Sequence, residues 1–204
     1  MNNIEAFILI GGRSSRLGTD KAFVELGGRT LAERAVENVR SGISPGQITM
    51  VAGSSTQFAI GALTSDVPFI FDLYKGRGPL GGLHAALAYA RTPWIFVLAC
   101  DYPFVSGELV LLLADSVDDE FGAVVPQQQD GRIQPLCGYY KVETARPIVD
   151  EIIERPRVSP PMHEVVDLLS PAVVVFEEYR HLDGSDEFFM NINTIEDLER
   201  ARTR

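Results

Sequence analysis

The chain has 204 residues, of which 46% are hydrophobic and 23% charged, a mixture that is typical of a folded globular protein and excludes a disordered one. Its apolar runs, such as 7–10 and 173–176, are far too short for a membrane-spanning helix, so no membrane is expected as a partner. No basic region followed by an apolar one opens the chain, so a cytoplasmic location is expected. Only two cysteines are present, Cys100 and Cys137, which excludes a disulfide scaffold and a structural zinc site.

The net charge of −10 argues against nucleic acid as a partner, because nucleic-acid binding depends on a positive field. Positive charge is nevertheless concentrated in one segment. Arg13, Arg16 and Lys21 fall within nine residues, and Asp20 is the only acidic residue among them. A local cluster of this kind can bind an anion on an otherwise acidic protein.

The hydrophobic patterns predict an alternation of strands and helices. In chain order we expect a strand at 4–10, a helix at 30–40, strands at 48–52 and 67–71, a helix at 79–90, a strand at 94–99, a helix at 108–116, strands at 123–125 and 137–140, and helices at 142–154 and 194–202. Capping pairs mark two helix starts, Thr30 with Glu33 and, more weakly, Thr194 with Asp197. This order predicts an α/β fold with a mostly parallel sheet covered by helices on both faces, in a single domain spanning 1–204.

Ligands of such sheets bind beyond the carboxyl ends of the strands. The first segment in that position contains Gly11 and Gly12, which allow the backbone to approach a ligand and leave amide groups free for phosphate oxygens. Arg16 and Lys21 add positive charge to this segment. The Walker pattern GxxxxGK[ST] is absent from the chain. The alternative is a solvated surface loop.

The second segment is a glycine-rich turn that contains Gly78, opens a predicted helix and follows Asp72. Helix N-termini favour anions. Gly76, Gly78 and Gly81 also match the dinucleotide pattern GxGxxG, with Asp101 twenty residues beyond the last of them. That pattern normally follows a strand at once, whereas four residues intervene here. An NAD- or flavin-dependent oxidoreductase and a purely structural turn remain alternatives.

Two further segments carry candidate ligands. Asp101 ends a buried strand in the sequence Cys-Asp-Tyr-Pro, and Mg²⁺ commonly takes one or two carboxylates together with substrate phosphates. A turn cap is the alternative role for this carboxylate. Asn191 and Asn193 lie on one face if their segment is extended, so their amides could bind a polar ring or a phosphate. Turn and helix-cap chemistry is the alternative for these two residues.

The four segments, in this order, resemble the signatures of the molybdenum cofactor guanylyltransferase family. The first resembles LAGGxxxRMGxDK, with Ile10 in place of alanine and Leu17 in place of methionine. The later segments GPLGG, CDYP and NINT resemble GPLAG, CDxP and NVNT. Order and spacing agree from about residue 4 to about residue 199. Gly53 departs from the pattern, since some relatives carry a nucleotide-contacting asparagine there.

The resemblance implies a three-layer Rossmann-like nucleotidyltransferase fold. It implies GTP and the molybdenum-molybdopterin cofactor as substrates, Mg²⁺ as cofactor, and molybdoenzymes or cofactor chaperones as protein partners. The residues that it assigns to the nucleotide are Leu9, Ile10, Gly11, Gly12, Lys21, Asp72, Gly78 and Asp101. Those that it assigns to the pterin are Arg16, Arg157, Asn191 and Asn193. Catalytic roles would belong to Asp101, which would also bind the metal, and to Lys21 and Arg16.

The attacking group would be the terminal phosphate of the pterin cofactor, which is already an anion near neutral pH. No strong general base is then required, so catalysis would depend on positioning and charge stabilisation. Other hypotheses remain at this stage. One is a nucleotidyltransferase that uses CTP with the same pterin, or another nucleotide with a sugar phosphate. A further one is a non-catalytic carrier of nucleotide or cofactor.

Overall fold

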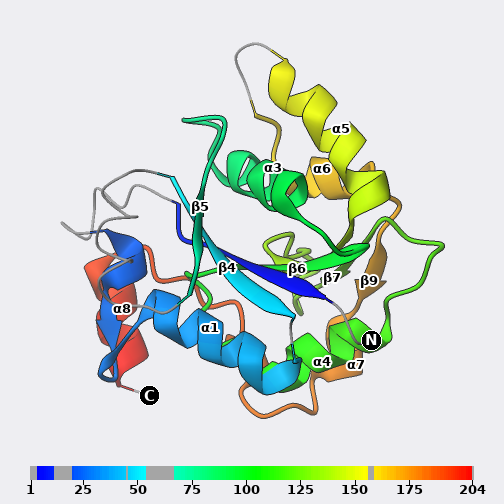
Figure 1. The fold of residues 1–204 in the computed structure, drawn as a ribbon. Helices are drawn as coiled ribbons and strands as arrows, with labels where there is room; N and C mark the ends of the chain where they lie inside the picture. Colours follow the sequence, from blue (N-terminus) through cyan, green and yellow to red (C-terminus); the bar gives the residue numbers. More distant parts are fainter. Residues whose placement is uncertain (1–3, 12–19, 45, 54–66, 156–158, 204) are drawn as a thin grey trace.

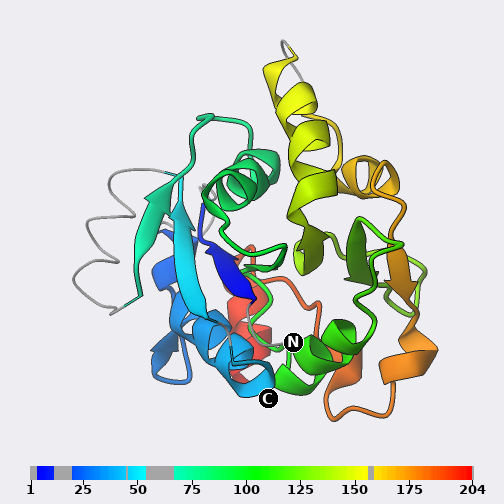
Figure 2. The ribbon, with the colours of Figure 1, turned by 45° about the vertical axis from the view of Figure 1, so that its right-hand side comes forward.

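A seven-stranded sheet forms the centre of the molecule, with helices packed on both of its faces (Figures 1 and 2). The structure, a computed structural model, describes residues 4–11, 20–44, 46–53, 67–155 and 159–203. The strand order is β5-β4-β1-β6-β8-β7-β9. The strands are β1 (Glu5–Leu9), β4 (Gln47–Ala52), β5 (Phe69–Phe71), β6 (Trp94–Ala99), β7 (Ala123–Pro126), β8 (Cys137–Lys141) and β9 (Ala172–Val174).

Most neighbouring strands run parallel. β1 pairs in parallel with both β4 and β6, β4 pairs in parallel with β5, and β7 with β9. The exception is β8, which is antiparallel to β6 and to β7. The prediction of a mostly parallel α/β sheet is therefore confirmed, with one strand inserted in the opposite direction.

Two layers of helices cover the sheet. Figure 2 shows one layer above the sheet and the other below it. The upper layer holds α3 (Pro79–Tyr89), α5 (Val142–Glu154) and α6 (Met162–Asp167). The lower layer holds α1 (Leu31–Gly42), α4 (Gly107–Asp115) and α7 (Phe176–Tyr179).

The side chains of β1 explain why both faces must be covered. Ala6, Ile8 and Ile10 enter the core between the sheet and α1 and α4. Phe7 and Leu9 enter the core on the other face, between the sheet and α3 and α5. Successive side chains of a strand point to opposite faces, so a strand that is apolar throughout is stable only between two layers.

A smaller unit stands at the edge of the sheet where β1 and β4 end, on the left of Figure 1. It contains the hairpin β2 (Glu25–Leu26) and β3 (Arg29–Thr30), the short helix η1 (Lys21–Phe23) and α8 (Ile195–Arg202). A separate apolar cluster holds this unit together, formed by Val24, Leu26, Leu31, Ile192, Leu198 and Ala201. An early segment of the chain, residues 21–31, and a late one, residues 192–201, thus meet at one place.

The predicted helices and main strands are confirmed, with ends that differ by one or two residues. Both capping pairs form full capping boxes, at Thr30 and at Thr194. Some elements were not predicted because they are too short to show a hydrophobic period: the hairpin, η1, α6, β9, α7 and the short helix η2 (Ser185–Glu187). One feature of the sequence, a pair of adjacent glycines, indicates the hairpin. Gly27 and Gly28 both have positive φ, +62° and +78°, as a tight two-residue hairpin turn requires.

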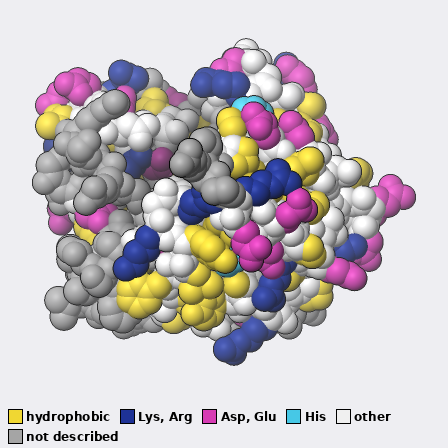
Figure 3. All heavy atoms as spheres, turned by 90° about the horizontal axis from the view of Figure 1, so that it is seen from above, with side chains coloured by type: hydrophobic (Ala, Val, Ile, Leu, Met, Phe, Trp, Pro, Cys, Tyr) yellow, Lys and Arg dark blue, Asp and Glu magenta, His cyan; other side chains and the backbone are white. Residues whose placement is uncertain are grey.

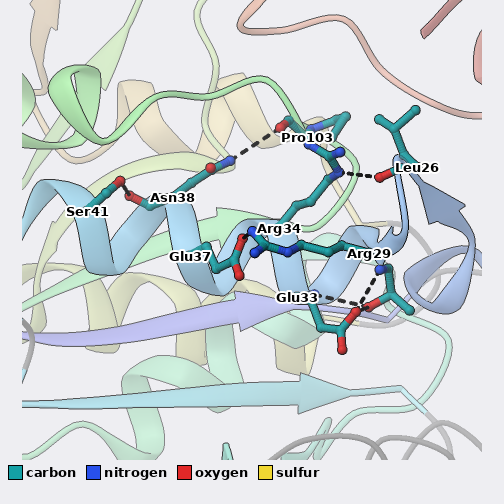
Figure 4. A network of polar contacts seen from close by, with 9 residues as sticks. Leu26, Arg29, Glu33, Arg34, Glu37, Asn38, Ser41 and Pro103 are labelled. Carbon is teal, nitrogen blue, oxygen red and sulfur yellow. Dashed lines mark hydrogen bonds and ion pairs between the residues drawn. The ribbon is translucent and has the colours of Figure 1, made fainter. Parts of the chain in front are cut away.

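The polar side of α1 connects the hairpin to the segment that follows β6 (Figure 4). At one end Arg34 Nε donates a hydrogen bond to the carbonyl oxygen of Leu26, 2.7 Å away. One turn further along, Asn38 Nδ2 donates to the carbonyl oxygen of Pro103 at 3.3 Å. Because Pro103 follows Asp101 by two residues, α1 holds the backbone next to this carboxylate as well as the hairpin next to Lys21.

Helices α1 and α4 of the lower layer contact each other at two glycines. A Cβ added to Gly42 at the end of α1 would lie 2.2 Å from the carbonyl oxygen of Gly107 at the start of α4. No side chain fits in that space, and the obstacle is backbone.

We therefore expect Gly42→Ala to lower the free energy of unfolding by about 1–3 kcal/mol, the usual range for overpacking. Urea unfolding followed by circular dichroism measures the change. Arg40→Ala, on an exposed position of the same helix, is the control and should stay within about 0.5 kcal/mol of the parent. Equal stability of the two variants would contradict the close approach.

Candidate active site

Four strand ends meet at one edge of the sheet. The backbone N–H of Cys100 donates to the carbonyl oxygen of Leu9 at 3.1 Å, and that of Ile10 donates to Val51 at 3.1 Å. On the next strand, the N–H of Asp72 donates to the carbonyl oxygen of Ala52 at 2.9 Å. The segments after β1, β4, β5 and β6 are thus neighbours, as the rule for ligand sites in open α/β sheets led us to expect.

A buried ammonium group joins three distant parts of the chain at this edge. Lys21 is only 9% exposed, and its Nζ donates to Asp101 Oδ2 at 2.8 Å and to Asn193 Oδ1 at 2.6 Å. A lysine ammonium has three N–H donors, so these two bonds leave one of them for another acceptor. The arrangement joins the residue that opens η1, a residue two positions after β6 and a residue two positions before α8.

Two contacts position the segments that carry these three side chains. The carboxylate of Asp20 caps η1 by accepting from the N–H of Ala22 at 3.3 Å, which sets the start of the turn that carries Lys21. The N–H of Ile192 donates to the backbone oxygen of Asp101 at 3.3 Å. This bond lays the Asn191–Asn193 segment alongside the segment that carries Asp101.

Two buried acceptor oxygens next to this group have no hydrogen-bond partner among the residues that the structure describes. They are Asp101 Oδ1 and Asn191 Oδ1. Beside them the hydroxyl of Tyr102 donates to Gln134 Oε1 at 2.8 Å. Burial raises the pKa of Tyr102, more than a hydrogen bond from Asn191 lowers it, so the phenol stays neutral and remains a donor. Acceptors without donors are suited to bind a cation or the polar hydrogens of a ligand.

The described residues alone do not complete a metal site at this edge. The described parts of the chain contain no group of three or more His, Cys, Asp or Glu side chains with the spacing of a metal site. Asp101 can supply one carboxylate oxygen, which is the number that Mg²⁺ needs when substrate phosphates and water complete its shell.

The carboxylate of Asp72 lies over the first turn of α3. A Cβ at Gly81 would be 2.5 Å from Asp72 Oδ2, so a side chain at this point of the helix would displace the carboxylate. Asp72 Oδ1 accepts from the N–H of Tyr74 at 2.8 Å. Burial raises the pKa of Asp72, and the Tyr74 N–H and the nearby His84 act in the opposite direction.

Glycines also bring backbone together at the first two strand ends. A Cβ at Gly11 would lie 3.3 Å from the backbone nitrogen of Gly53, so the segments after β1 and β4 are in close contact. At the start of α3, Gly78 is the N-cap residue and has φ of +60°. The glycines of the GxGxxG match do not follow a strand directly, because β5 ends at Phe71 and the helix begins only at Pro79. The geometry of a dinucleotide fingerprint is therefore not present at that match.

The segment before α3 is attached to the end of α5. The Arg77 guanidinium donates to the carbonyl oxygens of Ile153 and Arg155, and Ser159 Oγ donates to the carbonyl oxygen of Arg77 at 3.2 Å. The predicted residues Arg157, Gly12 and Arg16 lie outside the described residues.

Several residues near this edge were not found from the sequence as part of a site. Tyr102 and Gln134 come from different elements, and only the fold brings them together. His84 was expected to be an ordinary surface or helix residue; it lies in α3, but it is buried. A histidine in an otherwise apolar helix is the one signal that could have marked it.

The face of the molecule over the upper helix layer carries side chains of both signs (Figure 3). Among the coloured residues in Figure 3, Lys and Arg side chains lie between hydrophobic and acidic ones over the face seen from above. The net charge of −10 is therefore compatible with an anionic ligand, since local groups decide the field at short range.

Comparison with known families decides the relationship. The profile of the MobA-like NTP transferase domain matches residues 6–157. The chain belongs to the MobA-like NTP transferase family. It is accordingly a nucleotidyltransferase, which confirms the resemblance inferred from the four sequence segments.

Individual relatives of this MobA-like chain span almost its whole length. A probable molybdenum cofactor guanylyltransferase of Bacillus mycoides is 30% identical over 99% of the chain and 97% of that protein. Another, from Carboxydothermus hydrogenoformans, is 29% identical over 98% of the chain and 95% of that protein. The crystal structure of molybdopterin-guanine dinucleotide biosynthesis protein A from Archaeoglobus fulgidus matches with a TM-score of 0.81 and 29% identity, over 98% of this chain and 97% of that one. In the described parts of the present chain, no helix has the length and apolar character to cross a membrane.

The raised pKa of Asp72 predicts that its charge lowers stability. The folded state binds this proton more tightly than the unfolded chain does, so stability falls as pH rises from the ordinary aspartate value of 3.8 through the raised value. Asp72→Asn removes the titration, and its amide oxygen can still accept from Tyr74. We expect the variant to have a larger free energy of unfolding than the parent at pH 7–8. This difference in free energy should become smaller as the pH approaches 4.

Urea unfolding at a series of pH values measures this difference. Asp183→Asn, which changes an exposed carboxylate, is the control and should show no such trend. A variant that is less stable than the parent at pH 8 would contradict the prediction.

Proposed function

We propose that the chain transfers GMP from GTP to the terminal phosphate of the molybdenum-molybdopterin cofactor, with molybdopterin guanine dinucleotide and pyrophosphate as products. The observation that carries this proposal is the Lys21–Asp101–Asn193 group at the meeting point of the strand ends. The relatives named as probable molybdenum cofactor guanylyltransferases, which align over nearly the full chain, support the choice of substrates.

The nucleotide is proposed to lie between the end of β1 and the start of α3. Lys21 has a donor left for a phosphate oxygen. The backbone of Ile10 and Gly11 follows Leu9 directly at the end of the strand. The N-terminus of α3, opened by Gly78, favours negative charge. Asp72 supplies an acceptor for the hydroxyl or amino groups of the nucleoside. In this proposal Gly12 adds a further phosphate contact.

MobA-like nucleotidyltransferases generally use a divalent metal. The residues present fit one, because Asp101 Oδ1 is a buried carboxylate oxygen without a partner among the described residues. We assign Mg²⁺ to this oxygen. When bound there, Mg²⁺ neutralises charge on the phosphates.

The reaction needs no strong base from the protein. The attacking phosphate oxygen is already ionised near neutral pH, and it displaces pyrophosphate from the α-phosphorus in line. Cys100, next to Asp101, does not serve as a nucleophile in this scheme, because burial raises the pKa of its thiol and keeps it protonated. Positioning of the two phosphates and stabilisation of their charge by Lys21 carry the catalysis.

The acceptor is proposed to bind on the side of α8. Asn191 and Asn193 carry amides there, and Arg16 and Arg157 are assigned to the same subsite. Asn193 Oδ1 is bound to Lys21, which places this residue at the boundary between the two proposed subsites. Molybdoenzymes or cofactor chaperones are the protein partners to which the product would pass.

Pyrophosphate release tests the proposal directly. Purified protein is mixed with Mg²⁺ and molybdenum-molybdopterin cofactor, and GTP, CTP, ATP and UTP are compared. Release with GTP alone, and only when metal and pterin are both present, is the expected result. Release with CTP instead would overturn the base specificity, and GTP binding without release would favour the non-catalytic carrier.

The assignment of Asp101 predicts a specific loss of turnover. Asp101→Asn keeps an oxygen that can accept from Lys21 but removes the charge that attracts a divalent metal. We expect unchanged folding by circular dichroism and a fall in kcat of about 10²-fold or more, as for loss of one main electrostatic contact.

Binding of Mn²⁺, followed by electron paramagnetic resonance, should weaken in parallel. Asp115→Asn, on an exposed position of α4, is the matched control and should behave like the parent. Near-parental turnover of Asp101→Asn would remove the metal role from this residue.

A further inference from the structure

One buried polar side chain interrupts the apolar interior of α3. His84 is 7% exposed, and the other buried residues of this helix are leucine, alanine and glycine. Its Nε2 lies 3.1 Å from Asp150 Oδ1 on α5, and its Nδ1 is buried without a hydrogen-bond partner among the described residues. Burying an imidazole with one nitrogen unpaired costs free energy that an apolar side chain at this position would not cost.

Two contacts connect His84 to the carboxylate of Asp72. The ring of Tyr74 meets the His84 ring edge to face, with centroids 4.7 Å apart, while the N–H of the same tyrosine donates to Asp72 Oδ1 at 2.8 Å. The second contact runs through the helix. The Asp72 carboxylate lies against Gly81, which is three residues before His84 and therefore on the same side of α3.

We propose that His84 is a positioning residue for nucleotide binding, which holds the Asp72 carboxylate in place through Tyr74 and the first turn of α3. This inference rests on the proposed nucleotide-binding role of Asp72 and adds a residue behind it that the nucleotide does not touch. Asp150 holds the imidazole from the side of α5. The binding edge of the sheet is thereby connected to a helix on the far side of α3.

The charges around His84 support this arrangement. The groups that face it are Asp150 on α5, whose other oxygen lies 3.8 Å from Arg146 Nε, and Asp72 and Tyr74 on the segment before α3. Attraction to His84 lowers the pKa of Asp72 and so opposes the effect of burial. An ionised carboxylate accepts hydrogen bonds from nucleoside hydroxyl and amino groups, whereas a protonated one is a weaker acceptor.

A double-mutant cycle on GTP binding tests the inference. The proteins are the parent, His84→Gln, Asp72→Asn and the double variant, and the readout is the Kd for GTP from calorimetry. Glutamine can still donate to Asp150, so the packing of α3 on α5 is retained while the imidazole is lost. We expect His84→Gln to raise the Kd about three- to tenfold in the parent background and to have no further effect once Asp72 is asparagine. In turnover, KM for GTP should rise with kcat little changed.

The control variants distinguish a failure of the inference about His84 from a failure of the proposed role of Asp72. His181→Gln alters an exposed histidine and should leave the Kd unchanged. If Asp72→Asn alone does not weaken GTP binding, the proposed role of Asp72 is wrong. If Asp72→Asn weakens binding but His84→Gln has the same effect in both backgrounds, or none, the inference about His84 is wrong.

A second route is available if His84→Gln does not fold. Asp150→Asn alters a half-exposed residue of α5 and keeps an oxygen that can accept from the imidazole. We expect a smaller rise in Kd, about twofold, which again disappears in the Asp72→Asn background. A rise that persists in that background would overturn the proposal.

Discussion

The ammonium group of Lys21 requires a particular arrangement of the whole molecule. A lysine charge is stable in a buried position only when acceptors surround it, and here they come from Asp101 and Asn193, 80 and 172 residues further along the chain. The central sheet delivers the first acceptor at the end of β6. The second acceptor, Asn193, lies beside Lys21 only because α8 packs against the hairpin. The three groups therefore come together only when residues 21–31 and 192–201 pack against each other.

Much of this organisation was predictable from local patterns. The capping box at Thr30 and the apolar runs of β1 and β6 each contain enough information in a few neighbouring residues to fix an element. The rule that ligands bind beyond strand ends then pointed to the segments after β1, β5 and β6. These segments do lie together, and the contact of Lys21 with Asp101 follows from that placement.

The remainder depends on contacts that no local pattern contains. The reversed direction of β8 is set by its pairing with β6 and β7, not by its composition. Asn193 was assigned to the pterin, and nothing in its neighbourhood in the sequence indicates that its oxygen accepts from Lys21. His84 was passed over for the same reason, since its partners on α5 and on the segment before α3 are distant in sequence from it. Side chains that act through long-range contacts require the fold to be known first.

The small apolar cluster beneath the hairpin and α8 has a consequence for motion. It contains six buried residues, against the far larger clusters on the two faces of the sheet, so it protects its backbone amides less strongly than they do. Opening of this unit moves α8 and the Asn191–Asn193 segment away from Asp101, whereas Ala22 holds the turn that carries Lys21 in the core of the sheet. Hydrogen exchange in the hairpin and α8 then reports on how often the site comes apart. A ligand that bridges Asp101 and the Asn191–Asn193 segment slows that exchange, because it binds only the closed arrangement.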